Sequence, residues 1–158
     1  MIFATCGSSH LPFERLMRAL EVVSPEELVV QHGPAEPPAA ARAIAFLPYS
    51  EVVSLIDEAD VVISHAGVGS IICAIRAGHT PIVFPRMKRH SETVDDHQLD
   101  LATALSRRGT VRVAWTPDEL PDLIRSLPPR GDAVATDAQR LNAAVRAAIF
   151  GNALAPAA

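Results

Sequence analysis

The sequence predicts an α/β fold in which helices cover both faces of a six-stranded, mostly parallel sheet. Six short apolar runs predict the strands, at Ile2–Cys6, Leu28–Gln31, Ala43–Leu47, Val61–Ser64, Pro81–Pro85 and Val111–Trp115. Their residues are apolar throughout rather than alternating with polar ones, which is typical of strands that are covered on both faces. Segments with helical spacing lie between most of these runs, and this alternation indicates a parallel, doubly wound sheet.

Local signals mark where the predicted helices begin and end. A proline fits the first turn of a helix, a serine can cap its start, and a glycine commonly follows its last turn. These signals are Pro12 for the first helix, Ser50 as the N-cap of the second, Gly78 and Gly109 at the ends of the third and fourth, and Thr116-Pro117-Asp118-Glu119 at the start of the fifth.

The length of the chain, 158 residues, fits one domain with a core of its own. We expect that domain to occupy residues 1–128, with a proline-rich loop at His32–Arg42. Residues 129–158 are expected to form a linker and a C-terminal amphipathic helix, docked on this domain or on a partner. The helix is predicted from apolar residues at helical spacing, Leu141, Val145, Ala148 and Ile149.

Composition excludes several classes of protein. The formal net charge is −4, whereas a nucleic-acid-binding domain usually carries a basic surface, so no nucleic-acid partner is expected. Cys6 and Cys73 lack metal-ligand spacing and are expected to be reduced, and the histidines give no metal motif either. No apolar run approaches the ~20 residues of a membrane helix, and the first residues do not resemble a signal peptide. We therefore expect a cytoplasmic protein without a metal or a cofactor.

Glycine and serine follow two of the predicted strands. The first strand leads into Gly7-Ser8-Ser9-His10, and the fourth into His65-Ala66-Gly67-Val68-Gly69-Ser70. Each loop leads into the N-terminus of a helix, where free backbone N–H groups and the helix dipole favour an anion. Because the carboxyl ends of parallel strands meet at one edge of the sheet, the sequence predicts a phosphate site there.

Other interpretations of these loops are more ordinary. Either loop alone is equally well explained as a simple turn and helix start, and His65 alone as a hydrogen-bonded histidine at a strand end. Two such loops at one sheet edge favour the phosphate site. The first loop lacks G-x-G-x-x-G and no G-K-[ST] follows the glycines, so neither an NAD site nor a P-loop is predicted.

Four blocks of sequence, taken together, resemble the C-terminal domain of family-28 glycosyltransferases, which have the GT-B fold. The blocks are IFATCGSSHLPFERL, FLPYSEV, ADVVISHAGVGSIICAIRAGHTPIVFPR and DDHQLDLA. The likeness is greatest to short stand-alone versions, the dolichol-oligosaccharide N-acetylglucosaminyltransferase catalytic subunit and bacterial exopolysaccharide subunits of the glucuronosyltransferase type. It implies a Rossmann-like domain, equivalent to the C-terminal half of a GT-B enzyme, that binds a nucleotide-sugar.

The resemblance also implies roles for single residues. Gly7, Ser8 and Ser9 are similar to the turn that faces the donor diphosphate, and the segment with His65, Gly67, Val68, Gly69 and Ser70 to the helix start that holds the nucleotide phosphates. Phe46 and Tyr49 fall where the family borders the nucleoside, and Asp96 and Gln98 where it contacts hydroxyls of the transferred sugar. Asp96 is also explained as the start of a helix, and both roles can hold at once.

Two features qualify the resemblance. Many relatives place a glutamate, which accepts from ribose hydroxyls, at the position of Cys73, and a small residue here is similar to the exopolysaccharide branch. The basic segment Arg86–His90 fits a lipid-diphosphate acceptor or an anionic membrane face, and fits a solvated loop equally well.

From the resemblance we expect the donor-binding, catalytic subunit of a transferase that moves a hexose-type sugar from a UDP-sugar to a lipid-linked acceptor. His65 would stabilise the departing diphosphate, and His10 is the local candidate for proton transfer. The other half of the enzyme would be a membrane-anchored subunit that binds the acceptor and holds this chain at the inner face of the membrane. The alternative is a non-catalytic nucleotide-sugar-binding or regulatory module of the same fold.

Overall fold

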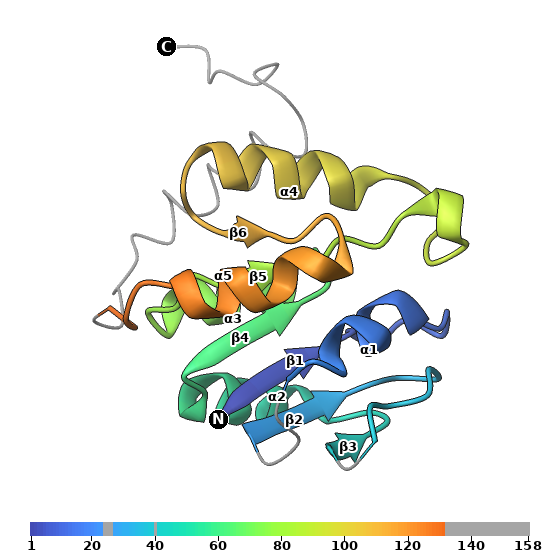
Figure 1. Cartoon of the computed structure of the whole chain (residues 1–158), viewed down its shortest axis with the longest axis horizontal. Helices are drawn as coiled ribbons and strands as arrows, with labels where there is room; N and C mark the ends of the chain where they lie inside the picture. Colours follow the sequence, from blue (N-terminus) through green and yellow to red (C-terminus); the bar gives the residue numbers. More distant parts are fainter. Residues whose placement is uncertain (24–26, 40, 132–158) are drawn as a thin grey trace.

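The computed structural model describes residues 1–23, 27–39 and 41–131, and it confirms the predicted doubly wound sheet (Figure 1). Six strands lie in the order β3-β2-β1-β4-β5-β6, and each neighbouring pair is parallel. The strands are β1 (Ile2–Thr5), β2 (Leu28–Gln31), β3 (Arg42–Ile44), β4 (Val61–Ser64), β5 (Ile82–Val83) and β6 (Arg112–Val113). The strand order reverses between β1 and β4, the place where sheets of this kind bind ligands.

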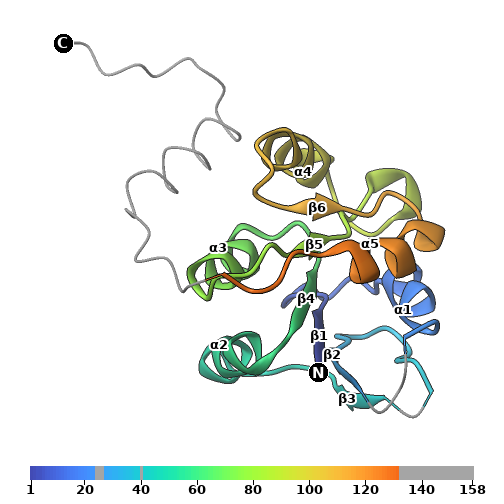
Figure 2. The ribbon, with the colours of Figure 1, turned by 60° about the vertical axis from the view of Figure 1, so that its left-hand side comes forward.

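Helices cover both faces of the sheet, as Figure 2 shows almost edge-on. The helices are α1 (Glu14–Leu20), α2 (Tyr49–Glu58), α3 (Val68–Arg76), α4 (His97–Arg107) and α5 (Leu120–Ser126), with short 3-10 turns η2 (Lys88–His90) and η3 (Pro117–Glu119). α1 and α5 pack on one face of the sheet, while α2, α3 and α4 pack on the other. Phe3, which is 0% exposed, points from the central strand into the second of these layers.

Several strands are shorter than the sequence predicts. β3 begins at Arg42 and ends at Ile44, and β5 and β6 have two residues each. β3 is an edge strand whose Arg42 and Ala43 are exposed, so the prediction of a strand covered on both faces is wrong there. Beyond Ile44 the ladder continues only through the Gly33 N–H, which donates to the Ala45 carbonyl at 2.9 Å.

The helix ends agree with the glycine signals and differ from two others. Gly78 (φ 85°) and Gly109 (φ 69°) have left-handed backbones just after α3 and α4, as predicted. The prediction of Ser50 as an N-cap is wrong, because the Pro48 carbonyl already accepts the Glu51 and Val52 N–H groups at 3.0 and 3.1 Å. Pro12 precedes α1 instead of lying in its first turn.

The chain after α5 returns to the helix ends on the other face. The Arg130 Nε donates to the Ala77 carbonyl at 2.6 Å, and the Gly131 N–H donates to the Gly78 carbonyl at 3.0 Å. The predicted helix around Leu141, Val145, Ala148 and Ile149 lies outside the described residues. Within the part of the chain that the structure describes, no helix is long and apolar enough to cross a membrane.

Candidate functional site

A pocket of about 370 Å³ opens at the carboxyl ends of β1, β2 and β4. Its volume lies within the range of small-molecule sites. It brings together many residues that the sequence predicts at a donor site: Gly7, Ser8, Tyr49, His65, Gly67, Gly69 and Ser70. Thr5, Gln31, Leu47, Val52 and Cys73 complete the lining.

The loop after β1 is held by a hydrogen-bonded pair at the base of the pocket. Thr5 Oγ1 donates to Gln31 Oε1 at 2.6 Å and accepts the Gly7 N–H at 3.0 Å. Gly7 turns the chain here with a φ of 76°, a backbone conformation that glycine adopts without strain. Neither Thr5 nor Gln31 was predicted for this site, although a polar side chain at the end of an apolar strand was a signal for each.

His65 fills the space between the two glycine loops. A Cβ atom added at Gly7 would lie 2.4 Å from His65 Cε1, and one added at Gly67 would lie 2.2 Å from His65 Nε2. Both distances are far below van der Waals contact. Gly67 was expected to admit a phosphate. The side on which a Cβ atom would stand receives the imidazole, so these two glycines leave room for His65. Gly67 also lines the pocket, and its role at a phosphate stays a prediction.

The imidazole of His65 is neutral at physiological pH. Burial, together with the positive charge of Arg86, lowers its pKa from 6.5 to about 4. Its Nδ1 atom is buried and has no hydrogen-bond partner among the described residues. A neutral imidazole has one N–H group, so His65 offers a ligand oxygen a hydrogen-bond donor and no full charge.

The start of α3 supplies further donors to the pocket. The first helical bond runs from the Ile71 N–H to the Gly67 carbonyl at 3.2 Å, so the N–H groups of Val68, Gly69 and Ser70 have no acceptor within the helix. Nothing lies within 4 Å of a Cβ atom built at Gly69. The free amides, the Ser70 hydroxyl and this open space fit an anion at the positive end of the helix dipole.

The wall of the pocket on the α2 side is mainly apolar. Leu47, Tyr49 and Val52 line it, and Cys73 of α3 faces them. Tyr49 Oη lies 3.2 Å from Cys73 Sγ, a contact that raises the pKa of the phenol. Such a surface is suited to the flat ring of a base. The predicted Phe46 is exposed and does not line the pocket.

Other predicted site residues lie outside this pocket: Ser9, His10, Val68, Asp96 and Gln98. Asp96 stands at the N-cap position of α4 without capping it, because its Oδ1 accepts the Lys88 N–H at 2.9 Å instead. Gln98 Oε1 accepts the Arg86 N–H at 3.1 Å. Both side chains therefore hold the segment after β5.

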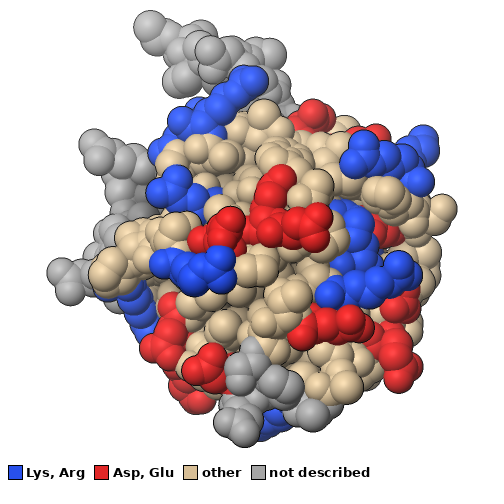
Figure 3. Space-filling model, viewed as in Figure 1, with Lys and Arg blue, Asp and Glu red and all other residues tan. Residues whose placement is uncertain are grey.

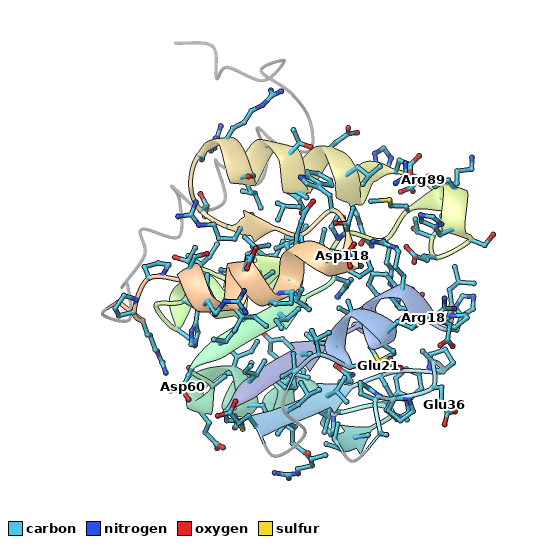
Figure 4. All side chains as sticks on the ribbon, in the orientation of Figure 1. Arg18, Glu21, Glu36, Asp60, Arg89 and Asp118 are labelled. Atoms are coloured by element: carbon cyan, nitrogen blue, oxygen red, sulfur yellow. The ribbon has the colours of Figure 1, made fainter. Side chains whose placement is uncertain are left out.

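The basic segment Arg86–His90 divides into a buried and an exposed part. Arg86 is 1% exposed, so the expectation that it meets an acceptor or a membrane is wrong for this residue. Lys88, Arg89 and His90 are exposed in η2. Figure 4 places the labelled Arg89 at the carboxyl end of the sheet, far from Asp60 at the amino end.

The pocket lining contains no charged side chain. Over the face shown in Figure 3, Lys and Arg are interspersed with Asp and Glu, and no continuous basic surface forms there. No group of three or more His, Cys, Asp and Glu side chains in residues 1–23, 27–39 and 41–131 is placed to hold a metal ion. Neutral donors and helix dipoles are therefore what this lining offers an anion.

Both glycine loops and the pocket between them fall within residues 1–149, which match the family model "Glycosyltransferase family 28 C-terminal domain". The chain belongs to this family. Membership confirms the predicted resemblance, and with it a transferase domain of the Rossmann-like type.

Two named relatives share part of this family-28 domain. They are UDP-N-acetylglucosamine transferase subunits ALG13, from Yarrowia lipolytica (37% identical over 62 residues, 39% of this chain and 30% of the relative) and from Cryptococcus neoformans var. neoformans serotype D (41% over 64 residues, 40% and 31%). The match thus spans less than a third of either relative.

A solved structure confirms the fold. The family-28 chain superposes on the crystal structure of the glycotransferase of kitacinnamycin with a TM-score of 0.55 and 22% sequence identity. The superposition covers 93% of this chain and 38% of that one. The architecture is accordingly that of one half of a GT-B glycosyltransferase.

Alanine at Gly67 and at Gly69 should have opposite effects on stability. Gly67→Ala places a methyl group against the His65 ring and should lower the free energy of unfolding by about 1–3 kcal/mol. The methyl group of Gly69→Ala would point into open space, and alanine is a better helix former than glycine. This variant should therefore leave the free energy of unfolding unchanged or raise it by up to about 1 kcal/mol. Urea denaturation measures both; equal effects would contradict the assigned position of the His65 ring.

The neutral state of His65 should make stability depend on pH. Between pH 6.5 and about 4 the unfolded chain binds a proton at this residue and the folded chain does not, so stability is lost as the pH falls through this window. The loss should approach about 3 kcal/mol, and His65→Gln should lack it. Urea unfolding followed by the fluorescence of Trp115, at pH 7 and pH 4.5, compares the two proteins; parallel losses would refute the assignment.

Proposed function

We propose that the pocket binds the nucleoside diphosphate of a UDP-sugar, and that this chain is the donor-binding, catalytic subunit of a hexosyltransferase. The observation that carries the proposal is the start of α3, where free amides, the Ser70 hydroxyl and the open side of Gly69 lie in one pocket with His65. The apolar wall of Leu47 and Val52 fits a base beside that anion site. The printed name of the ALG13 relatives, UDP-N-acetylglucosamine transferase subunit, supports a UDP-sugar as the donor.

In the proposed reaction an acceptor hydroxyl attacks the anomeric carbon of the sugar. The bond from that carbon to the diphosphate oxygen breaks, and its electron pair remains on the oxygen. The α3 amides, Ser70 and the neutral His65 stabilise this developing negative charge by donating hydrogen bonds. Because they are fixed before the reaction, they need little reorganisation during it.

The acceptor proton needs a base, and the pocket lining offers no carboxylate. We propose that the base comes from a second subunit, with the exposed His10 of the loop after β1 as the alternative on this chain. That subunit would be membrane-anchored, bind a lipid-diphosphate-linked acceptor and hold this chain at the cytoplasmic face. The relatives support a partner by being named subunits.

Asp96 and Gln98 are proposed to contact hydroxyls of the transferred sugar. Each uses one oxygen to accept a backbone N–H, which leaves the second Asp96 oxygen and the Gln98 amide group for a ligand. A carboxylate and an amide together accept from and donate to neighbouring hydroxyls. The backbone contacts fix both side chains before a sugar arrives.

The missing carboxylate also favours a second function, a nucleotide-sugar-binding module without catalysis. The same pocket would then bind the donor and leave the chemistry to another protein. Transfer assays with radiolabelled UDP-sugars and a lipid-diphosphate acceptor, with and without a membrane subunit, distinguish the two. Donor binding without transfer in either assay would support the module.

Removal of one hydrogen-bonding side chain from the pocket should weaken the binding of UDP, measured by calorimetry. Ser70→Ala loses a hydrogen bond to a charged oxygen and should raise the Kd about tenfold or more. His65→Ala should do the same, and Gly69→Ala should block the anion without loss of stability. Ser54→Ala, an exposed serine of α2 outside the pocket, is the matched control and should bind as the wild type does. Unchanged affinity in the three pocket variants would refute the site.

A further inference from the structure

Arg86 lies directly behind the glycine loop that follows β1. Its Nη2 donates to the Cys6 carbonyl at 3.0 Å, and its Nη1 donates to the Leu11 carbonyl at 3.0 Å and to the Pro12 carbonyl at 3.4 Å. These carbonyls stand at the two ends of the segment Gly7–His10. One guanidinium therefore joins the residue before this segment to the two residues after it.

The same residue also reaches the two segments on its other side. Nη1 donates to the Glu92 carbonyl at 2.9 Å, and the backbone N–H donates to Gln98 Oε1 at 3.1 Å, in the first turn of α4. The guanidinium carbon lies 4.5 Å from the centre of the Phe13 ring, which packs against it. Arg86 thus joins the loop after β1, the segment after β5 and the start of α4.

The charges around Arg86 leave one positive charge without a counterion. Glu92, 4% exposed, is already bound by Arg15, with contacts of 3.0 and 2.8 Å to its two oxygens, and it accepts the Met87 N–H at 2.9 Å. Among the described residues the hydrogen bonds of the Arg86 guanidinium all go to backbone carbonyl oxygens, and its Nε is buried without a partner there. Two guanidinium groups thus share one carboxylate.

Burying a positive charge costs free energy unless the charge is both hydrogen-bonded and paired, and Arg86 has the hydrogen bonds but no counterion in contact among the described residues. The pocket lining has no charged side chain, whereas a nucleoside diphosphate carries at least two negative charges. A charge behind the loop acts through protein rather than through water, so its field at the pocket is poorly screened. The lowered pKa of His65, which lines the pocket, agrees with this, since the charge of Arg86 contributes to it after burial.

We propose that Arg86 is a positioning residue of the donor site, which fixes the loop Gly7–His10 against the start of α4 and supplies a buried positive charge that favours the diphosphate. Arg86 does not touch the ligand. The proposal rests on the proposed function, since it assigns a role in binding a nucleoside diphosphate. A purely structural role would use the same contacts, so the experiment compares ligands with and without phosphates.

NMR titrations of the full chain with UDP and with uridine test the proposal in wild type, Arg86→Met, Arg86→Lys and the control Arg112→Met, an exposed arginine of β6. Arg86→Met should weaken UDP binding about tenfold or more and leave uridine binding unchanged. Arg86→Lys keeps the charge but cannot span two carbonyls with a planar fork, so its UDP affinity should fall between the other two. The control should match the wild type.

The titration of His65 gives a second readout, because Arg86→Met removes the charge of Arg86 from the surroundings of the ring while Arg86→Lys keeps it. In Arg86→Met the pKa of His65 should rise from about 4 by only part of the way, because burial, the larger cause of the low value, remains, while Arg86→Lys should keep the pKa low. UDP affinity equal to wild type in Arg86→Met, or equal losses for UDP and uridine, would overturn the proposal. If Arg86→Met does not fold, Arg86→Lys decides, and wild-type UDP affinity there overturns it. A wild-type chain that binds neither ligand refutes the proposed function instead.

Discussion

The parallel direction of all six strands determines where the pocket lies. Every strand ends at the same edge, and β1 pairs directly with β4. The glycines of the loops that follow these two strands therefore lie close together. The helix that follows β4 turns its free amides toward the same point. The position of His65 depends on this arrangement, since its ring is held between glycines from two loops that are far apart in sequence.

Local signals in the sequence were sufficient to predict the fold and to name many of the residues that line the pocket. Apolar runs located the strands, and the glycines that end α3 and α4 are where the spacing placed them. Ser50 shows the limit of such signals, since a serine near a helix start resembles a cap, whereas α2 already begins at Tyr49 and Pro48 stands at the N-cap position. The short β3 likewise reflects its place at the sheet edge, which composition alone does not indicate.

Long-range contacts account for what the sequence could not predict. In the sequence Arg86 was one member of a basic segment. In the structure it is buried, and its guanidinium donates a hydrogen bond to the carbonyl of Cys6, 80 residues earlier. Gly67 was predicted at a phosphate, and the structure adds that the side where its Cβ atom would stand is filled by the ring of His65. In each case the residue type was noticed and its role was set by a neighbour that only the folded chain brings near. Roles for Asp96, Gln98 and His10 stay predictions.

The apolar wall between α2 and α3 has a consequence for how such a domain changes its specificity. The groups suited to an anion come from backbone amides, Ser70 and His65, and they would serve any nucleoside diphosphate equally. The wall is built by other side chains, those of Leu47, Tyr49, Val52 and Cys73. Under the proposed function, substitutions in this wall would select a different base or ribose contact and leave the anion half intact, so that donor preference would diverge without the loss of donor binding.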